Sequence, residues 1–136
     1  MKDCRFQVWD IRNRELYPVC LIRRNVSGSI TVNATSDPDE WRPIQVSGKS
    51  RQGILLQSIG RVDKNGRYVF EGDIVDCNRY PTDEIFRVVI KDIRSIPPEM
   101  SGSSLNSVEV VGNVFQNPDF LPKGLCDIVI KALGCE

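Results

Sequence analysis

The sequence of 136 residues contains no histidine, and this absence excludes several classes of enzyme at once. Ser-His-Asp and Cys-His catalysis both need an imidazole as the general base. Zinc is usually held by histidines or by closely spaced cysteines, and the five cysteines include no C-x-x-C pair. We therefore expect no catalytic residues, no bound metal and no cofactor from these residue types.

Long hydrophobic runs and an excess of one charge are also missing. No apolar stretch approaches the roughly 20 residues of a membrane-spanning helix, and the chain opens on a strand pattern instead of an apolar signal core. We expect no membrane partner. The 18 basic and 18 acidic residues balance, which argues against tight non-specific nucleic-acid binding but leaves room for a local basic patch.

Arginine is the more abundant basic residue, and many arginines are adjacent to one another or flank predicted turns. They are either part of a solvated mixed-charge surface or a patch that faces phosphate. The residues concerned are Arg12, Arg14, Arg23, Arg24, Arg61 and Arg67.

The cysteines are odd in number and irregular in spacing, which is typical of reduced thiols in a cytoplasm. They are Cys4, Cys20, Cys77, Cys126 and Cys135. A reactive cysteine needs a lowered pKa, often from a helix N-terminus. Cys126, near the start of the last predicted helix, is the one candidate.

Alternating apolar and β-branched residues predict many short strands at close spacing. This rhythm favours a mostly β fold, a small antiparallel barrel or sandwich, and not a parallel α/β sheet. The predicted strands are 4–9, 16–22, 29–32, 53–62, 68–70, 74–78, 85–93 and 108–115.

Three regions interrupt this pattern. Pro18 places the second strand at a sheet edge or a bend. Residues 33–43 are rich in turn and cap residues and predict a loop, with a helical turn at Pro38 capped by Asp37 and with Trp41 as its apolar anchor. Residues 97–106 predict a Pro/Gly/Ser loop with little to bury.

The stretch from Leu55 to Val75 carries two turn patterns that predict a compact antiparallel unit. Asn65 and Gly66 tolerate positive φ, and the Asp63 side chain can bond to the backbone two residues on. Gly72 and Asp73 predict the second sharp bend.

Two further turn residues lie near the last strand. Gly112 predicts a bulge or a close approach of two backbones. Asn117, followed by Pro118, predicts the cap of a short helical turn.

The tail changes from a strand period to a helix period. Its apolar residues are spaced as one face of a helix over about 124–133, and this face packs either on the protein's own sheet or on a second subunit. We expect one domain over 1–136, or two β subdomains at about 1–50 and 51–121 followed by the helix. The predicted face comprises Leu125, Ile128, Val129, Ala132 and Leu133.

Other patterns are weaker. Ser47–Ser50 reads SGKS but lacks the preceding glycine and the following helix of a phosphate-binding loop. The carboxylates could build a divalent-metal site, although turn and surface roles explain them. They are Asp63, Glu71, Asp73, Asp76, Asp83 and Glu84.

Four residues could form a nucleic-acid patch, because small barrels bind single strands on basic, aromatic faces. These are Arg67, Tyr68, Arg79 and Tyr80. The two tyrosines are equally consistent with half-buried residues at the rim of a barrel.

Three blocks, in order, resemble the YopX family of phage and prophage proteins. They are Arg5–Asp10 with Glu15–Tyr17, Leu56–Gly60 with Asp63–Gly66 and Phe70–Val75, and Val108–Pro118. The chain departs from the family pattern at Ser58–Ile59 and Arg61–Val62. The segment after Leu121 matches no family pattern.

The resemblance implies a β-rich fold with SH3-like barrel character, homo-oligomeric assembly and no assigned activity. We therefore expect a prophage-encoded accessory protein, acting as a homo-oligomer in the cytoplasm of a bacterial host and binding a phage or host protein. The alternatives are single-stranded nucleic-acid binding, a structural role in phage assembly, and a metal-dependent enzyme that uses carboxylates.

Overall fold

A computed structural model describes residues 5–37, 40–79, 84–98 and 105–133. The chain divides into two compact units. Among the described residues, unit 1 extends to Gln57 and unit 2 comprises Ser58–Leu133. The strand β5 (Gly53–Val62) contributes its first half to unit 1 and its second half to unit 2.

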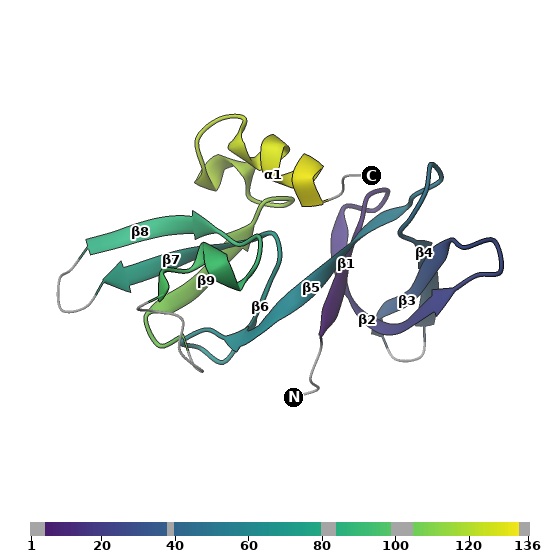
Figure 1. The fold of residues 1–136 in the computed structure, drawn as a ribbon, viewed down its shortest axis with the longest axis horizontal. Coiled ribbons are helices and arrows are strands. Elements are labelled where there is room, and N and C mark those ends of the chain that lie inside the picture. The colour runs from purple at the N-terminus through teal and green to yellow at the C-terminus, as the bar shows by residue number, and fades with distance from the viewer. Residues whose placement is uncertain (1–4, 38–39, 80–83, 99–104, 134–136) are drawn as a thin grey trace. The chain divides into compact units, whose positions relative to one another are not determined.

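Unit 1 is an antiparallel sheet in the order β4-β3-β2-β1-β5 (Figure 1). Val8 in β1 pairs with Tyr17 in β2 and with Leu55 in β5, so these side chains share one face of the sheet. The other strands are β1 (Phe6–Asp10), β2 (Glu15–Arg24), β3 (Ile30–Asp37) and β4 (Glu40–Gln45).

The core of unit 1 lies on that face of the curved sheet. It is small and aliphatic, with one tyrosine whose hydroxyl reaches a polar partner. Its buried members are Val8, Tyr17, Val32, Ala34 and Ile44.

The predicted barrel or sandwich does not take the form of a closed barrel in the part of the chain that the structure describes. The backbone N–H of Gln52 donates to the carbonyl of Gln45 at 2.7 Å, which brings the end of β4 next to the start of β5. The described residues of β4 and β5 do not pair as strands, however, so the sheet curls without closing. The barrel prediction was wrong in this respect, and the SH3-like character stays a prediction.

The prediction of a loop over residues 33–43 was also wrong, because β3 and β4 form a hairpin there. Asn33 pairs with Pro43, and Ala34 pairs with Arg42. The side chain of Ala34 is fully buried. Small and polar residues hide the strand alternation in this segment. The predicted helical turn at Pro38 and the side chain of Trp41 lie outside the described residues.

Pro18 does not mark a sheet edge, because β2 lies between β1 and β3. The residue pairs with Gln7 of β1. The register between β2 and β3 shifts between Val19 and Leu21, which leaves Cys20 as the extra residue of a bulge. The prediction of a sheet edge was therefore wrong, and the bend at Pro18 stays a prediction.

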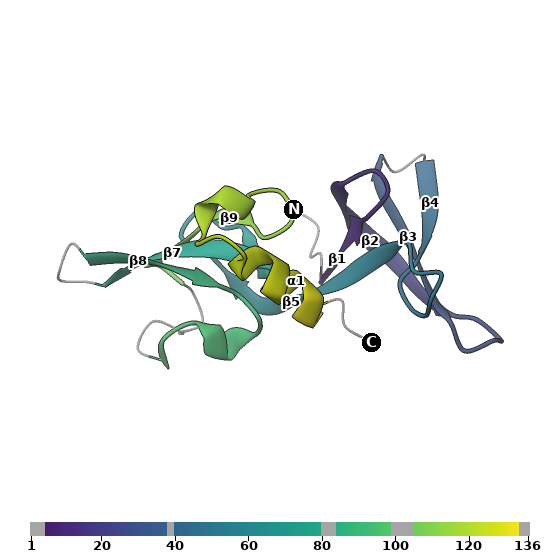
Figure 2. The ribbon, with the colours of Figure 1, turned by 90° about the horizontal axis from the view of Figure 1, so that it is seen from above.

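Unit 2 contains the hairpin of β5 with β6 (Tyr68–Phe70) and a second antiparallel sheet in the order β8-β7-β9. In both ribbon views β7 (Asp73–Arg79) and β8 (Glu84–Val89) run side by side (Figure 2). β9 (Val108–Asn113) pairs on the other side of β7. The buried core of this unit comprises Val69, Val75, Cys77, Ile90, Ile96, Leu105, Val108 and Val110.

The prediction that residues 97–106 have little to bury was wrong at Leu105. Its side chain is fully buried, and its backbone N–H donates to the carbonyl of Val62 at 3.1 Å. The nearby 3-10 turn η1 (Ile93–Ser95) is capped by Asp92 and leads into buried Ile96. The connection between β8 and β9 therefore contributes to the core.

The C-terminal helix α1 (Leu125–Leu133) forms where predicted, but its buried face overlaps the predicted face only in part. Cys126 and Val129 are buried, whereas Leu125 and Ile128 are exposed, Ile128 by 68%. The packed stripe is thus rotated from the predicted one. The helix follows a 3-10 turn η3 (Pro118–Phe120).

Candidate functional site: an arginine-lined pocket in unit 1

Asp63 acts as a hub for backbone groups in unit 2. Its carboxylate accepts hydrogen bonds from the N–H groups of Asn65 and Arg67, both at 2.9 Å, and of Val110 at 3.0 Å. Gly66 completes the turn with a φ of +81°. The side chain of Asp63 is buried and committed to the fold, which argues against a chemical role.

Asp73 occupies the second predicted bend. Its carboxylate accepts a hydrogen bond from the N–H of Phe70 at 2.9 Å. Burial raises the pKa of Asp73 to about 7 despite this bond and the charge of Arg67. Gly72 has a φ of +87°, and a Cβ there would meet Phe115 at 3.2 Å.

Gly112 and Asn117 lie against each other. The side-chain oxygen of Asn117 accepts a hydrogen bond from the N–H of Asn113 at 3.1 Å, and a Cβ on Gly112 would meet it at 2.5 Å. Asn117 precedes η3 but makes no side-chain cap bond to it. The side chain reaches back to β9 instead of forward to the helical turn.

Only two of the four residues of the predicted nucleic-acid patch have side chains that the structure describes. Arg67 is exposed and Tyr68 is half-buried at the start of β6. Arg79 ends β7, but its side chain is not described, and Tyr80 lies outside the described residues. The patch therefore stays a prediction.

Asp76, another of the candidate carboxylates, is held in an ion pair. Arg87 donates to both oxygens of Asp76, at 2.7 and 3.1 Å, and its guanidinium lies over the ring of Phe120. No group of three or more Cys, Asp or Glu side chains within the described residues could hold a metal ion. Asp83 lies outside them.

Cys126 lacks the environment of a reactive thiol. Its side chain is buried, and its Sγ lies 3.7 Å from the carbonyl oxygen of Pro118. Burial, with Asp127 and Asp119 as lesser causes, raises the pKa of the Cys126 thiol.

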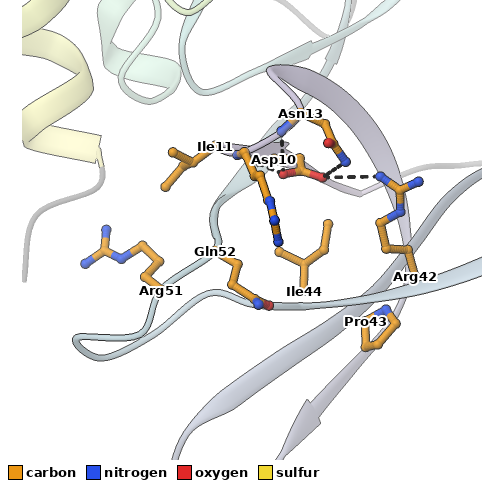
Figure 3. Close-up of a pocket in the computed structure, with 9 residues that line it drawn as sticks. Asp10, Ile11, Asn13, Arg42, Pro43, Ile44, Arg51 and Gln52 are labelled. Atoms are coloured by element: carbon orange, nitrogen blue, oxygen red, sulfur yellow. Dashed lines mark hydrogen bonds and ion pairs between the residues drawn. The ribbon is translucent and has the colours of Figure 1, made fainter.

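A pocket of about 570 Å³ opens in unit 1, between the β1–β2 turn, β4 and the segment before β5 (Figure 3). Arg42 and Arg51 lie on opposite sides of it, with Ile44 and Gln52 between them. The lining residues are Asp10, Ile11, Arg12, Asn13, Arg42, Pro43, Ile44, Arg51 and Gln52.

Asp10 organises one wall of this pocket. One carboxylate oxygen accepts hydrogen bonds from the N–H groups of Arg12, at 3.0 Å, and Asn13, at 3.1 Å. The other accepts from the Asn13 amide at 2.9 Å and forms an ion pair with Arg42 at 3.5 Å. Asp10 is 4% exposed. It thereby fixes both the turn and the neighbouring guanidinium.

Arg42 is held from a second side by Tyr17. Its guanidinium lies 5.3 Å from the centre of the Tyr17 ring and donates to the Tyr17 hydroxyl at 3.2 Å. That hydroxyl donates to Glu15 at 2.8 Å, and this bond is the main reason that the pKa of Tyr17 is raised. The Arg42 side chain remains 50% exposed. It is pre-oriented yet accessible.

The pocket has a local excess of positive charge. Three guanidinium groups line it, from Arg12, Arg42 and Arg51, against one carboxylate from Asp10. Sequence reasoning singled out Arg12 but missed Arg42 and Arg51, because they come from segments 30 or more positions away in the sequence. A correct assignment of β4 would have put Arg42 and Ile44 on one face.

The Ser47–Ser50 segment contributes no phosphate loop. Gly48 has a φ of +78°, and the Ser47 hydroxyl accepts a hydrogen bond from the N–H of Ile30 at 2.8 Å. Strand β5 follows this segment instead of a helix.

Comparison with known families gives a match over residues 5–122 to the profile described as YopX protein. The chain belongs to the YopX family. This YopX chain is also similar to a solved structure, "Crystal structure of protein EF1440 from Enterococcus faecalis", with a TM-score of 0.51 and 20% identity. The similarity covers 87% of this chain and 97% of the other.

At that identity the similarity shows a shared fold and no more. No curated protein matches this YopX chain. Among the described residues, no helix has the length and apolar character needed to cross a membrane. The family and the fold are thus established, and the pocket is the feature of the described residues that bears on function.

Proposed function

We propose that this protein is a non-enzymatic interaction protein that binds an anionic group of a partner in the arginine-lined pocket of unit 1. The observation that carries the proposal is the arrangement around Arg42. A buried carboxylate and a tyrosine hold its guanidinium in place while half of the side chain stays exposed. A guanidinium fixed in this way loses less entropy when it binds a carboxylate or a phosphate.

The rest of the pocket supports anion binding. Arg12 and Arg51 add two positive charges, and Asn13 and Gln52 add side-chain amides. The Asp10 carboxylate is occupied by four donors and is almost fully buried, so it does not repel a ligand strongly at the pocket surface. The arrangement offers donors and charge but no nucleophile or general base.

The family membership supports the wider role. We propose that the protein is prophage-encoded, acts in the bacterial cytoplasm and assembles as a homo-oligomer that presents several copies of the pocket to a phage or host partner. Size-exclusion chromatography with light scattering tests the assembly. A monomer at high protein concentration would contradict the oligomer.

A titration with citrate, followed by NMR of the backbone amides, tests the pocket. We expect the amides of Arg12, Asn13 and Gln52 to shift and the shifts to weaken strongly in Arg42→Gln. Arg24→Gln is the matched control, because Arg24 is an exposed arginine outside the pocket. If the same titration with pyrophosphate also leaves these amides unmoved, the pocket does not bind anions.

Single-stranded nucleic-acid binding is the second candidate. Exposed Arg67 next to half-buried Tyr68 supports it, as do the pocket arginines. Phosphate contacts are strongest at low salt. A labelled oligothymidylate that fails to bind even at low salt would eliminate this candidate.

A further inference from the structure

The pocket of unit 1 combines charge with apolar surface, and this combination restricts the class of ligand that fits it. Ile11 is 46% exposed although it is a large aliphatic residue. Pro43, which also lines the pocket, is exposed as well. A ligand for this surface has to offer a negative group and an apolar group side by side.

A nucleic acid meets only half of this requirement. Single strands are held by aromatic rings on which bases stack, in addition to basic side chains. The described residues that line the pocket include no aromatic side chain. The ring of Tyr17, which lies beside Arg42, already packs against its guanidinium. The pocket therefore offers phosphate contacts without a stacking platform.

A protein segment meets both halves. The carboxylate of an Asp or Glu side chain matches the planar guanidinium of Arg42, and a neighbouring aliphatic side chain matches Ile11 and Pro43. The side-chain amides of Asn13 and Gln52 can pair with the peptide groups of such a segment. A volume of about 570 Å³ accommodates a few residues.

We propose that the pocket recognises an acidic side chain next to an aliphatic one in a protein partner. Arg42 binds the carboxylate through its guanidinium, and Asp10 positions Arg42. This inference rests on the proposed anion-binding function and specifies the ligand. The test also includes a nucleic acid as the competing ligand.

Selection of short random peptides on the immobilised full-length protein, at physiological salt, is the test. We expect the enriched peptides to share an Asp or Glu next to Leu, Ile or Val. Replacing that acid by its amide should weaken binding at least about tenfold, as should Arg42→Gln, because each removes a charge-assisted hydrogen bond. Arg24→Gln should leave the affinity unchanged, and thermal unfolding verifies that each variant is folded.

Arg12→Glu provides a second variant, since Arg12 is exposed and its backbone contact with Asp10 does not depend on its side chain. It should also weaken peptide binding. Asp10→Asn tests positioning: it should lower the affinity for acidic peptides more than for their amide counterparts, which loss of folding alone would not do.

Enriched peptides without an acid, no enriched peptides, or binding unaffected by both Arg42→Gln and Arg12→Glu would each overturn the inference. If an oligothymidylate binds in an Arg42-dependent manner and peptides do not, the ligand class is wrong while anion binding stands. If citrate, pyrophosphate, peptides and the oligonucleotide all fail, the proposed function fails as well.

Discussion

The carboxylate of Asp63 accepts a hydrogen bond from the backbone N–H of Val110, at 3.0 Å and across 47 positions of the sequence. The same carboxylate closes its own turn through Asn65 and Arg67. One buried side chain therefore ties the β5–β6 turn to the outer side of β9.

Asp63→Ala should destabilise the protein by about 2–4 kcal/mol, because it leaves buried N–H groups without acceptors. Asp63→Asn keeps one acceptor oxygen and should cost less. Urea unfolding followed by circular dichroism measures both, with the exposed neighbour Lys64→Ala as the control. An Asp63→Ala variant within about 0.5 kcal/mol of the parent would contradict the hub role.

Asp73 should make stability fall as the pH rises toward neutrality. Its pKa is raised to about 7 in the folded state, from an ordinary value of 3.8, mainly by burial. The folded protein thus holds a proton that the unfolded chain releases near pH 4. The stabilisation is complete below that pH and is lost as the pH rises through about 7, at up to about 1.4 kcal/mol per pH unit.

The pH dependence of the difference between the parent and Asp73→Asn isolates this contribution. Asn cannot ionise, and its carbonyl oxygen can still accept from the N–H of Phe70. Urea midpoints measured from about pH 4 to pH 8 should show the variant gaining on the parent as the pH rises. A constant difference over that range would show that the pKa of Asp73 is not raised.

Any side chain at Gly53 should lower the stability of the protein. A Cβ there would lie 2.7 Å from Ile44, 2.8 Å from Val8 and 2.9 Å from the carbonyl of Trp9. Gly53→Ala should cost about 1–3 kcal/mol through overpacking. Gly60→Ala, on the same strand, meets nothing within 4 Å and should cost only the strain of its φ of +79°. Equal losses in the two variants, measured by chemical denaturation, would contradict the close approach.

The packed face of α1 should be evident from two substitutions. Val129 is 7% exposed and Ile128 is 68% exposed. Val129→Ala should cost about 1–2 kcal/mol, and Ile128→Ala should stay within about 0.5 kcal/mol of the parent. The reverse order in thermal or urea unfolding would contradict the packing through Val129 and would show that Ile128 is covered, as in an oligomer.

Local chemistry explains which elements the sequence could predict. The turns around Gly66 and Gly72 depend on residues that favour positive φ, so neighbouring positions suffice to place them. The third partner of Asp63 could not be foreseen, because Val110 comes close only through the pairing of β7 with β9. A family resemblance, by contrast, was readable from the three sequence blocks and is confirmed by the match over residues 5–122.

The pocket was missed for two physical reasons. Residues 33–43 have few large apolar side chains, so turn propensity outweighed the weak strand pattern and hid β4. The pocket also needs β4, the β1–β2 turn and the residues before β5 in one place, which only the register of the curled sheet specifies. Arg42 and Arg51 therefore looked like ordinary surface charges.

Pro43 has a consequence for how copies of this chain can associate. It lies on β4, the outermost strand of unit 1, and Gln45 on the same strand already exchanges hydrogen bonds with Gln52 on the side away from β3. Pro43, two residues earlier, points to the same side and has no N–H to offer. This border cannot template a further strand, so the protein is protected there against fibre-like growth. Any assembly of YopX copies through unit 1 has to be built from side-chain contacts and not by extension of its sheet at β4.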